Sequence, residues 1–84
     1  VIVGAYPNPF NPSTVISYEI HKQSDVNISV FNLNGQLVSE LYDGNQDVGN
    51  YQVNFDGEGL SSGMYFIKIN NQAEVHTQKV LLMK

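Results

Sequence analysis

The chain has 84 residues, of which 42% are hydrophobic and only 14% are charged, and its formal net charge is −4. This composition is typical of one folded domain rather than of a disordered segment. The four lysines are scattered along the sequence, which argues against nucleic acid or an anionic membrane as a partner, because both need a dense cationic surface. No cysteine is present, so neither a disulfide nor a zinc-thiolate site is available.

The first distinctive feature is AYPNPFNPSTVISYEI (residues 5–20), in which three prolines precede a strand-like pattern. Proline lacks the N–H that a strand ladder needs, so the strand is expected to begin near Ser13. We call the proline-rich segment, residues 7–12, the lead. Its prolines predict an extended, polyproline-like conformation, and Tyr6 and Phe10 are expected to anchor it on the rest of the domain.

Apolar and polar residues alternate with a period of two over most of the chain, which is typical of strands with one buried face. Segment 36–42 also fits two helical turns, but its length and the preceding Asn34-Gly35 hairpin dipeptide favour a strand. The regular spacing of short strands predicts an all-β fold, an immunoglobulin-like antiparallel β-sandwich of about seven strands. The predicted strands are 3–6, 14–20, 25–32, 36–42, 50–55, 64–70 and 73–83.

Two segments rich in Asp and Gly, 42–50 and 56–63, are predicted to be long polar loops. Their carboxylates could hold calcium, but turn formation explains them better, because an Asp side chain accepts a hydrogen bond from its own backbone in such turns. The residues concerned are Asp43 and Asp47 in the first loop and Asp56 and Glu58 in the second.

Catalytic chemistry has few candidates. His21 and His76 are the two imidazoles, and each lies beside polar residues with no nucleophile motif nearby. A serine, a histidine and Asp25 could be assembled into a triad, but most β-domains offer such residues. We therefore expect no catalytic site, no metal site, no cofactor and no enzymatic activity.

Exposed aromatic side chains could form a platform for sugars. This leaves open a second interpretation, an adhesive or carbohydrate-binding accessory module. The candidate aromatics are Phe10, Phe31, Tyr42 and Phe66.

Three stretches occur in one order: YPNPFNPSTVISYEI, then FNLNGQLVSEL, then GNYQVNFDGEGLSSGMYFIKI followed by KVLLMK. This arrangement closely resembles the type A C-terminal sorting domain of the type IX (Por) secretion system. It is similar, more distantly, to the immunoglobulin-like domain of flagellar hook-capping proteins. The resemblance extends from Tyr6 to Lys84, so residues 1–84 are expected to be a single sorting domain excised from a longer secreted protein.

The resemblance implies a noncatalytic signal that directs its parent protein across the outer membrane of a Gram-negative bacterium. The implied partners are the outer-membrane translocon, the sortase machinery and a parent (cargo) domain N-terminal to the chain. In many members a sortase removes the domain, and the cargo is attached to the cell surface or secreted. By resemblance, the recognition residues are Tyr6, Pro7, Asn8, Pro9, Phe10, Gly63, Tyr65, Lys79, Val80, Leu81, Leu82, Met83 and Lys84.

The last predicted strand is apolar on both faces, with Val80 and Leu82 on one and Leu81 and Met83 on the other. Such a strand is expected either to be covered on both sides or to be an edge with which a receptor pairs. The same edge could pair with a second copy and give a dimer. We further expect the signal to be the folded combination of both ends of the chain.

Overall fold

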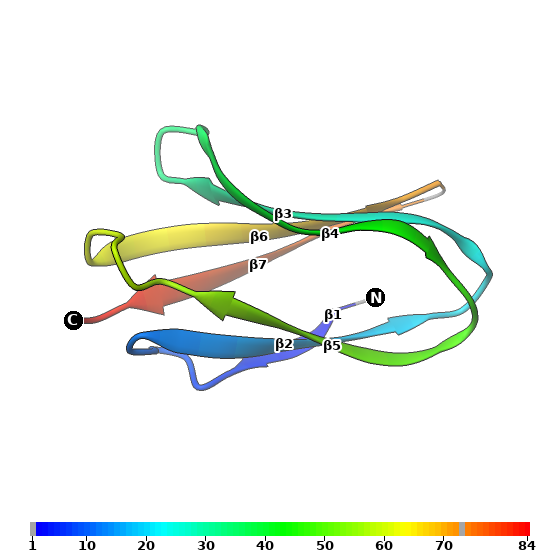
Figure 1. Ribbon diagram of the computed structural model, residues 1–84, viewed down its shortest axis with the longest axis horizontal. Helices are drawn as coiled ribbons and strands as arrows, with labels where there is room; N and C mark the ends of the chain where they lie inside the picture. Colours follow the sequence, from blue (N-terminus) through cyan, green and yellow to red (C-terminus); the bar gives the residue numbers. More distant parts are fainter. Residues whose placement is uncertain (1, 73) are drawn as a thin grey trace.

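The computed structural model of the chain describes residues 2–72 and 74–84 and is a sandwich of two antiparallel sheets (Figure 1). We call the three-stranded sheet β1-β2-β5 sheet A and the four-stranded sheet β4-β3-β6-β7 sheet B. The all-β sandwich prediction is confirmed. The described residues contain no helix with the length and apolarity to cross a membrane. The strands are β1 (Ile2–Tyr6), β2 (Ser13–Ile20), β3 (Ser24–Asn32), β4 (Leu37–Gln46), β5 (Gly49–Asp56), β6 (Gly63–Asn71) and β7 (Val75–Leu82).

The prediction of a long loop at 42–50 is wrong. β4 continues to Gln46, and β5 begins at Gly49. The polar residues of this stretch belong to an edge strand, in which Gln46 pairs with Ser24 at the start of β3. One face and one edge of β4 meet solvent, so polar residues there suit a strand as well as a loop. The predicted strand at 73–83 corresponds to β7, and its first residue, Ala73, lies outside the described residues.

Alternate residues of the strands point into the space between the sheets and form one hydrophobic core. Each of these side chains is at most 7% exposed. Removing them from water is the main favourable contribution to folding, at about 25 cal/mol per Å² of apolar surface. The strand residues of the core are Ile16, Tyr18, Ile20, Val26, Ile28, Val30, Phe55, Tyr65, Ile67, Ile69, Val80 and Leu82.

Tyr18 is one of the two tyrosines of this core. Its ring stacks on Tyr51, with centroids 5.6 Å apart, and its hydroxyl donates a 2.9 Å hydrogen bond to Gln46 Oε1. Burial raises the pKa of the Tyr18 hydroxyl, so the neutral, hydrogen-bonded phenol is the form that the folded domain holds.

Phe10 belongs to the core although it lies outside the strands. Its side chain is 2% exposed, and its ring centroid is 5.6 Å from that of Phe55. The prediction that Phe10 anchors the lead is therefore confirmed. The same prediction for Tyr6 is wrong, because Tyr6 pairs with Val15 on the outer face of sheet A and is 81% exposed.

Gly57 lies where the lead, β5 and β7 approach one another most closely. A Cβ at this position would lie 2.9 Å from Leu82 Cδ2, 3.0 Å from the Pro12 carbonyl oxygen and 3.2 Å from Phe10 Cε2. Its N–H also donates a 2.7 Å hydrogen bond to that carbonyl. No other residue type fits without moving the lead or the last strand.

Replacing Gly57 with alanine should therefore lower the free energy of unfolding by about 1–3 kcal/mol, because the added methyl group overpacks a filled site. Urea denaturation of the purified chain measures the change. Gly4→Ala is the matched control, because a Cβ at Gly4 meets no atom within 4 Å. Equal stability of the two variants would contradict the tight contact.

Candidate recognition site

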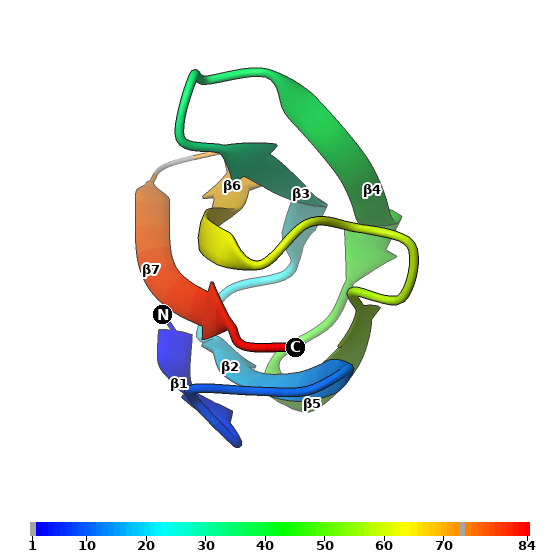
Figure 2. The same cartoon turned by 90° about the vertical axis from the view of Figure 1, so that its left-hand side faces the viewer.

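Three segments that carry the sorting-domain resemblance, namely the lead, the start of β6 and the end of β7, lie side by side at one end of the sandwich. Leu82 of β7 pairs with Gly63 of β6 on one side and forms a parallel bridge with Phe10 of the lead on the other. In the same register, Tyr65 pairs with Val80. Figure 1 shows this end, with the C-terminus, on the left, and Figure 2 looks onto it.

The lead is hydrogen-bonded to the outer edge of β7 at four points. The Phe10 N–H donates to the Leu81 carbonyl, and the Met83 N–H donates to the Phe10 carbonyl, both at 2.9 Å. The Asn8 side chain makes the other two bonds: its Nδ2 donates to the Lys79 carbonyl at 3.2 Å, and its Oδ1 accepts from the Leu81 N–H at 3.0 Å. A side-chain amide has one donor group and one acceptor, so Asn8 bonds to the strand as a peptide unit would.

The lead is fixed from both ends. The hydroxyl of Thr14, which is 1% exposed, donates a 2.8 Å bond to the Pro7 carbonyl, and the Gly57 N–H donates to the Pro12 carbonyl. The chain bends at residues 7–9 and again at 11–12 instead of running straight. The predicted polyproline-like conformation is therefore wrong, because the backbone must turn to bring Phe10 into the core.

The two faces of the last strand are covered to different extents. Val80 and Leu82 are 1% and 0% exposed and belong to the core. On the other face, Leu81 is half-buried beside the lead, whereas Met83 is 55% exposed. Of the two expected arrangements, covering of both faces is therefore only partial, and the edge of the strand is bonded to the lead along residues 79–83.

Two segments with the spacing Gly-x-Tyr, Gly49-Asn50-Tyr51 and Gly63-Met64-Tyr65, form the same local structure. The Tyr65 hydroxyl donates a 2.7 Å bond to the Ser61 carbonyl, four residues earlier, and the Tyr51 hydroxyl does the same to the Asp47 carbonyl. Gly63 and Gly49, two residues before each tyrosine, have φ values of +151° and +158°, which disfavour side chains. The motif therefore closes the loop before β5 and before β6, and Tyr65 is buried in this role.

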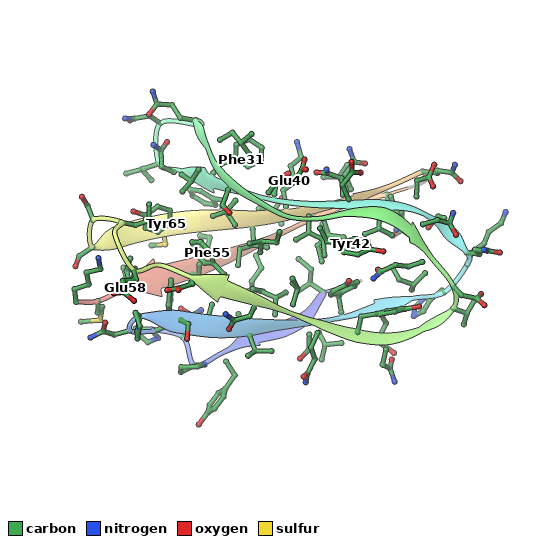
Figure 3. All side chains as sticks on the ribbon, in the orientation of Figure 1. Phe31, Glu40, Tyr42, Phe55, Glu58 and Tyr65 are labelled. Carbon is green, nitrogen blue, oxygen red and sulfur yellow. The ribbon has the colours of Figure 1, made fainter. Side chains whose placement is uncertain are left out.

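The four candidate aromatics do not form one platform. Phe10 is buried, and Tyr42 packs against the core between the sheets, so both are excluded as exposed sugar-binding residues. Phe31 and Phe66 are half-buried and pair directly across β3 and β6. Figure 3 shows Phe31 on the outer side of sheet B and Tyr42 on the inner side. Lys68 Nζ lies 5.9 Å from the centre of the Phe31 ring.

The histidines and carboxylates have ordinary surface roles. His21 is exposed, and His76 Nε2 lies 2.9 Å from Glu74 Oε2. Within residues 2–72 and 74–84, no group of three His, Cys, Asp or Glu side chains is arranged to hold a metal ion. Asp56 Oδ1 accepts a 2.9 Å bond from the Glu58 N–H, which confirms its predicted turn role. Asp43 lies within β4, so a turn there is wrong.

Three residues that hold the site were missed by the sequence interpretation. Thr14 and Gly57 bond to the lead, and the Ser62 hydroxyl accepts a 3.0 Å bond from the Lys84 N–H. Thr14 and Ser62 are small polar residues of a kind common in strands and turns, so nothing in their type marks them. Gly57 follows an Asp in a turn signal, which conceals its second role as a point of close approach.

Replacing Asn8 with alanine should lower the free energy of unfolding by about 1–2 kcal/mol, because two exposed hydrogen bonds are lost. It should also speed hydrogen exchange of the Leu81 amide, which the Asn8 side chain covers. Asn8→Asp keeps the acceptor but loses the donor, so its effect should also include repulsion at the Lys79 carbonyl. Hydrogen exchange followed by NMR measures both effects.

Asn11→Ala is the matched control, because Asn11 is an exposed asparagine of the same lead. It should leave the Leu81 amide protected. If Asn8→Ala and Asn11→Ala exchange at the same rate at Leu81, the side chain of Asn8 does not hold β7.

Comparison with known families agrees with this geometry. The family described as "Secretion system C-terminal sorting domain" matches residues 4–83. No curated protein and no solved structure matches the chain. The family match covers nearly the whole chain and includes the lead, the start of β6 and the end of β7, which meet at one end of the sandwich. The chain belongs to the C-terminal sorting domains of the Por (type IX) secretion system, noncatalytic signals of proteins exported across the outer membrane to the cell surface or the medium.

Proposed function

We propose that the secretion machinery recognises this domain as a folded unit, through the surface formed where the lead, the start of β6 and the end of β7 meet. One observation carries the proposal: Asn8 bonds to both Lys79 and Leu81, which lie 71 and 73 residues further along the chain. The display of the terminal residues therefore depends on the lead. A short linear tag would need no such contact.

The residues assigned by resemblance divide into two groups on this proposal. Exposed side chains that are not bonded to a neighbouring strand make contact with the machinery, and residues that are buried, half-buried or bonded through their side chain to a neighbouring strand hold the surface in shape. Tyr6, at 81% exposure, and Met83, at 55%, represent the first group. The first group is Tyr6, Pro7, Pro9, Lys79, Met83 and Lys84, and the second is Asn8, Phe10, Gly63, Tyr65, Val80, Leu81 and Leu82.

We also propose that the chain is carried by a parent protein whose cargo domain lies N-terminal to it. The outer-membrane translocon is the proposed reader, and a sortase the proposed processing enzyme. The family match supports these partners, because a sorting domain acts on a protein to which it is joined.

The folded-unit proposal is tested with a fluorescent reporter in a bacterium that has a working Por system. A reporter fused to the full chain should reach the medium or the surface, whereas a reporter ending in residues 79–84 alone should stay in the periplasm. A fusion carrying Asn8→Ala should be exported less efficiently than one carrying Asn11→Ala. Export by the six-residue tail alone would show that a linear signal suffices.

The predicted dimer is proposed to form through the part of the β7 edge that the lead leaves uncovered, residues 75–78. The backbone groups of Lys79 and Leu81 face the lead, so by alternation those of Thr77 also face away from β6. An uncovered edge of this kind pairs readily with another strand.

Sedimentation of the purified chain at high concentration should therefore show a dimer. Thr77→Pro should abolish it, because proline removes an outward N–H without breaking a bond to β6. Thr77→Val is the control that keeps the N–H. A chain that remains monomeric, or a dimer that survives Thr77→Pro, would contradict pairing through this edge.

A further inference from the structure

The outer faces of the two sheets differ in chemistry. On sheet A, the outward positions of β2 and β5 are mostly uncharged and polar, as alternation predicts for a solvent-exposed face. They are Ser13, Val15, Ser17 and Glu19 on β2 and Asn50, Gln52, Asn54 and Asp56 on β5. On sheet B, the outward positions of β6 and β7 combine large apolar side chains with lysine. They are Met64, Phe66, Lys68 and Asn70 on β6 and Val75, Thr77, Lys79 and Leu81 on β7.

The apolar side chains of sheet B lie next to one another in register. Phe31 pairs with Leu37 on one side and with Phe66 on the other, and Phe66 pairs with Lys79. In the neighbouring pair along β6 and β7, Met64 lies opposite Leu81. Leu37 is 61% exposed and Lys79 is also exposed, whereas Phe31, Met64, Phe66 and Leu81 are half-buried. These side chains form a continuous surface, which we call the aromatic-lysine face.

The aromatic-lysine face continues into the recognition site. An open groove lies between the outward side chains of β6 and β7 and the lead. The residues at its outer surface are Asn8, Pro9, Met64, Thr77, Lys79 and Leu81. The groove therefore joins Asn8, which holds the last strand, to the outer face of sheet B.

On β6 and β7 of sheet B, the outward side chains have a net positive charge, which is opposite in sign to the charge of the whole chain. Two of the four lysines, Lys68 and Lys79, lie at diagonal positions of β6 and β7, and the outward positions of these strands carry no carboxylate. The nearest acidic residue along the cross-strand row, Glu40 on β4, accepts a 3.0 Å hydrogen bond from Asn27 Nδ2. In a chain of net charge −4, the outward charges of β6 and β7 are thus positive, whereas the adjoining β3 and β4 carry the outward carboxylates Asp25, Glu40 and Asp43.

We propose that the aromatic-lysine face docks a protein segment of the secretion machinery in which apolar side chains are flanked by carboxylates. The apolar part covers Phe31, Phe66 and Leu81, and the carboxylates pair with Lys68 and Lys79. This inference rests on the proposed function and adds the chemistry of the partner to it. A membrane surface is disfavoured, because two lysines attract anionic lipid only weakly, and nucleic acid needs more cations still.

The test uses the reporter fusion to the full chain in a Por-competent bacterium. Lys68→Glu should lower the exported reporter about tenfold, because it replaces an attraction with a repulsion. Lys22→Glu makes the same charge change at an exposed lysine outside this face and should leave export unchanged. Phe66→Thr should also impair export, whereas Val15→Thr, at an outward position of sheet A, should not.

A photoreactive residue in place of Thr77 identifies the partner. It should cross-link to a protein of the Por system. Replacing a carboxylate of that partner beside the cross-link with lysine should then restore export of the Lys68→Glu fusion, because the charges are exchanged between the two surfaces. Thermal unfolding of each purified variant shows whether it folds. If Lys68→Glu unfolds the chain, Lys79→Glu replaces it in the same scheme, because the bond from Asn8 is to the Lys79 backbone carbonyl, which the substitution keeps.

The outcomes separate this inference from the proposed function. A wild-type fusion that stays in the periplasm contradicts the proposed function itself. Normal export of folded Lys68→Glu and Phe66→Thr fusions overturns the docking face alone. Binding of the wild-type chain to anionic phospholipid vesicles, lost in Lys68→Glu and accompanied by no protein cross-link, also overturns it and identifies a lipid surface instead.

Discussion

The side chain of Asn8 forms with the last strand the two hydrogen bonds that a peptide unit of a neighbouring strand would form. The rest of the recognition site depends on these two bonds. Without the Asn8 side chain, the Leu81 N–H would lose its partner at the sheet edge, and the Lys79 carbonyl would keep only the bond from Gln78 Nε2. With it, one residue of the lead bonds β7 from outside while Phe10, two residues later, enters the core. The backbone edge and the hydrophobic core are thereby closed by the same short segment.

The prolines of the lead limit how far strand pairing can continue beyond β7. Pro7 and Pro9 have no N–H, so neither residue can donate a hydrogen bond to a further strand. The lead can therefore cover the end of β7 without becoming a fully pairing edge itself. Along β7, the part that the lead leaves open is residues 75–78, next to the groove and the aromatic-lysine face. The proposed pairing and the proposed docking therefore both use the β7 side of sheet B.

Much of the fold could be predicted from the sequence, because a period of two fixes which residues face the core. Phe10 could be expected in the core from its place among the prolines, but Tyr6 could not be distinguished from it, since both are aromatic residues beside a proline. The hydrogen bonds of Asn8 could not be predicted, because they join residues 71 and 73 positions apart. The C-terminal end of β4 could not be predicted, because polar residues are common both in edge strands and in loops. The position of Lys68 beside the Phe31 ring could not be predicted, because it depends on the register between β3 and β6.

The contact between Asn8 and the last strand also makes the order of synthesis matter. A ribosome makes the lead among the first residues of this domain and the strand it bonds among the last. Asn8 and the backbone of Phe10 lack their hydrogen-bond partners until residues 79–83 have emerged, so an interrupted or clipped polypeptide cannot close this end of the sandwich. A receptor that reads the closed form consequently reads the integrity of the polypeptide as well, and truncated products lack the feature that would admit them to export.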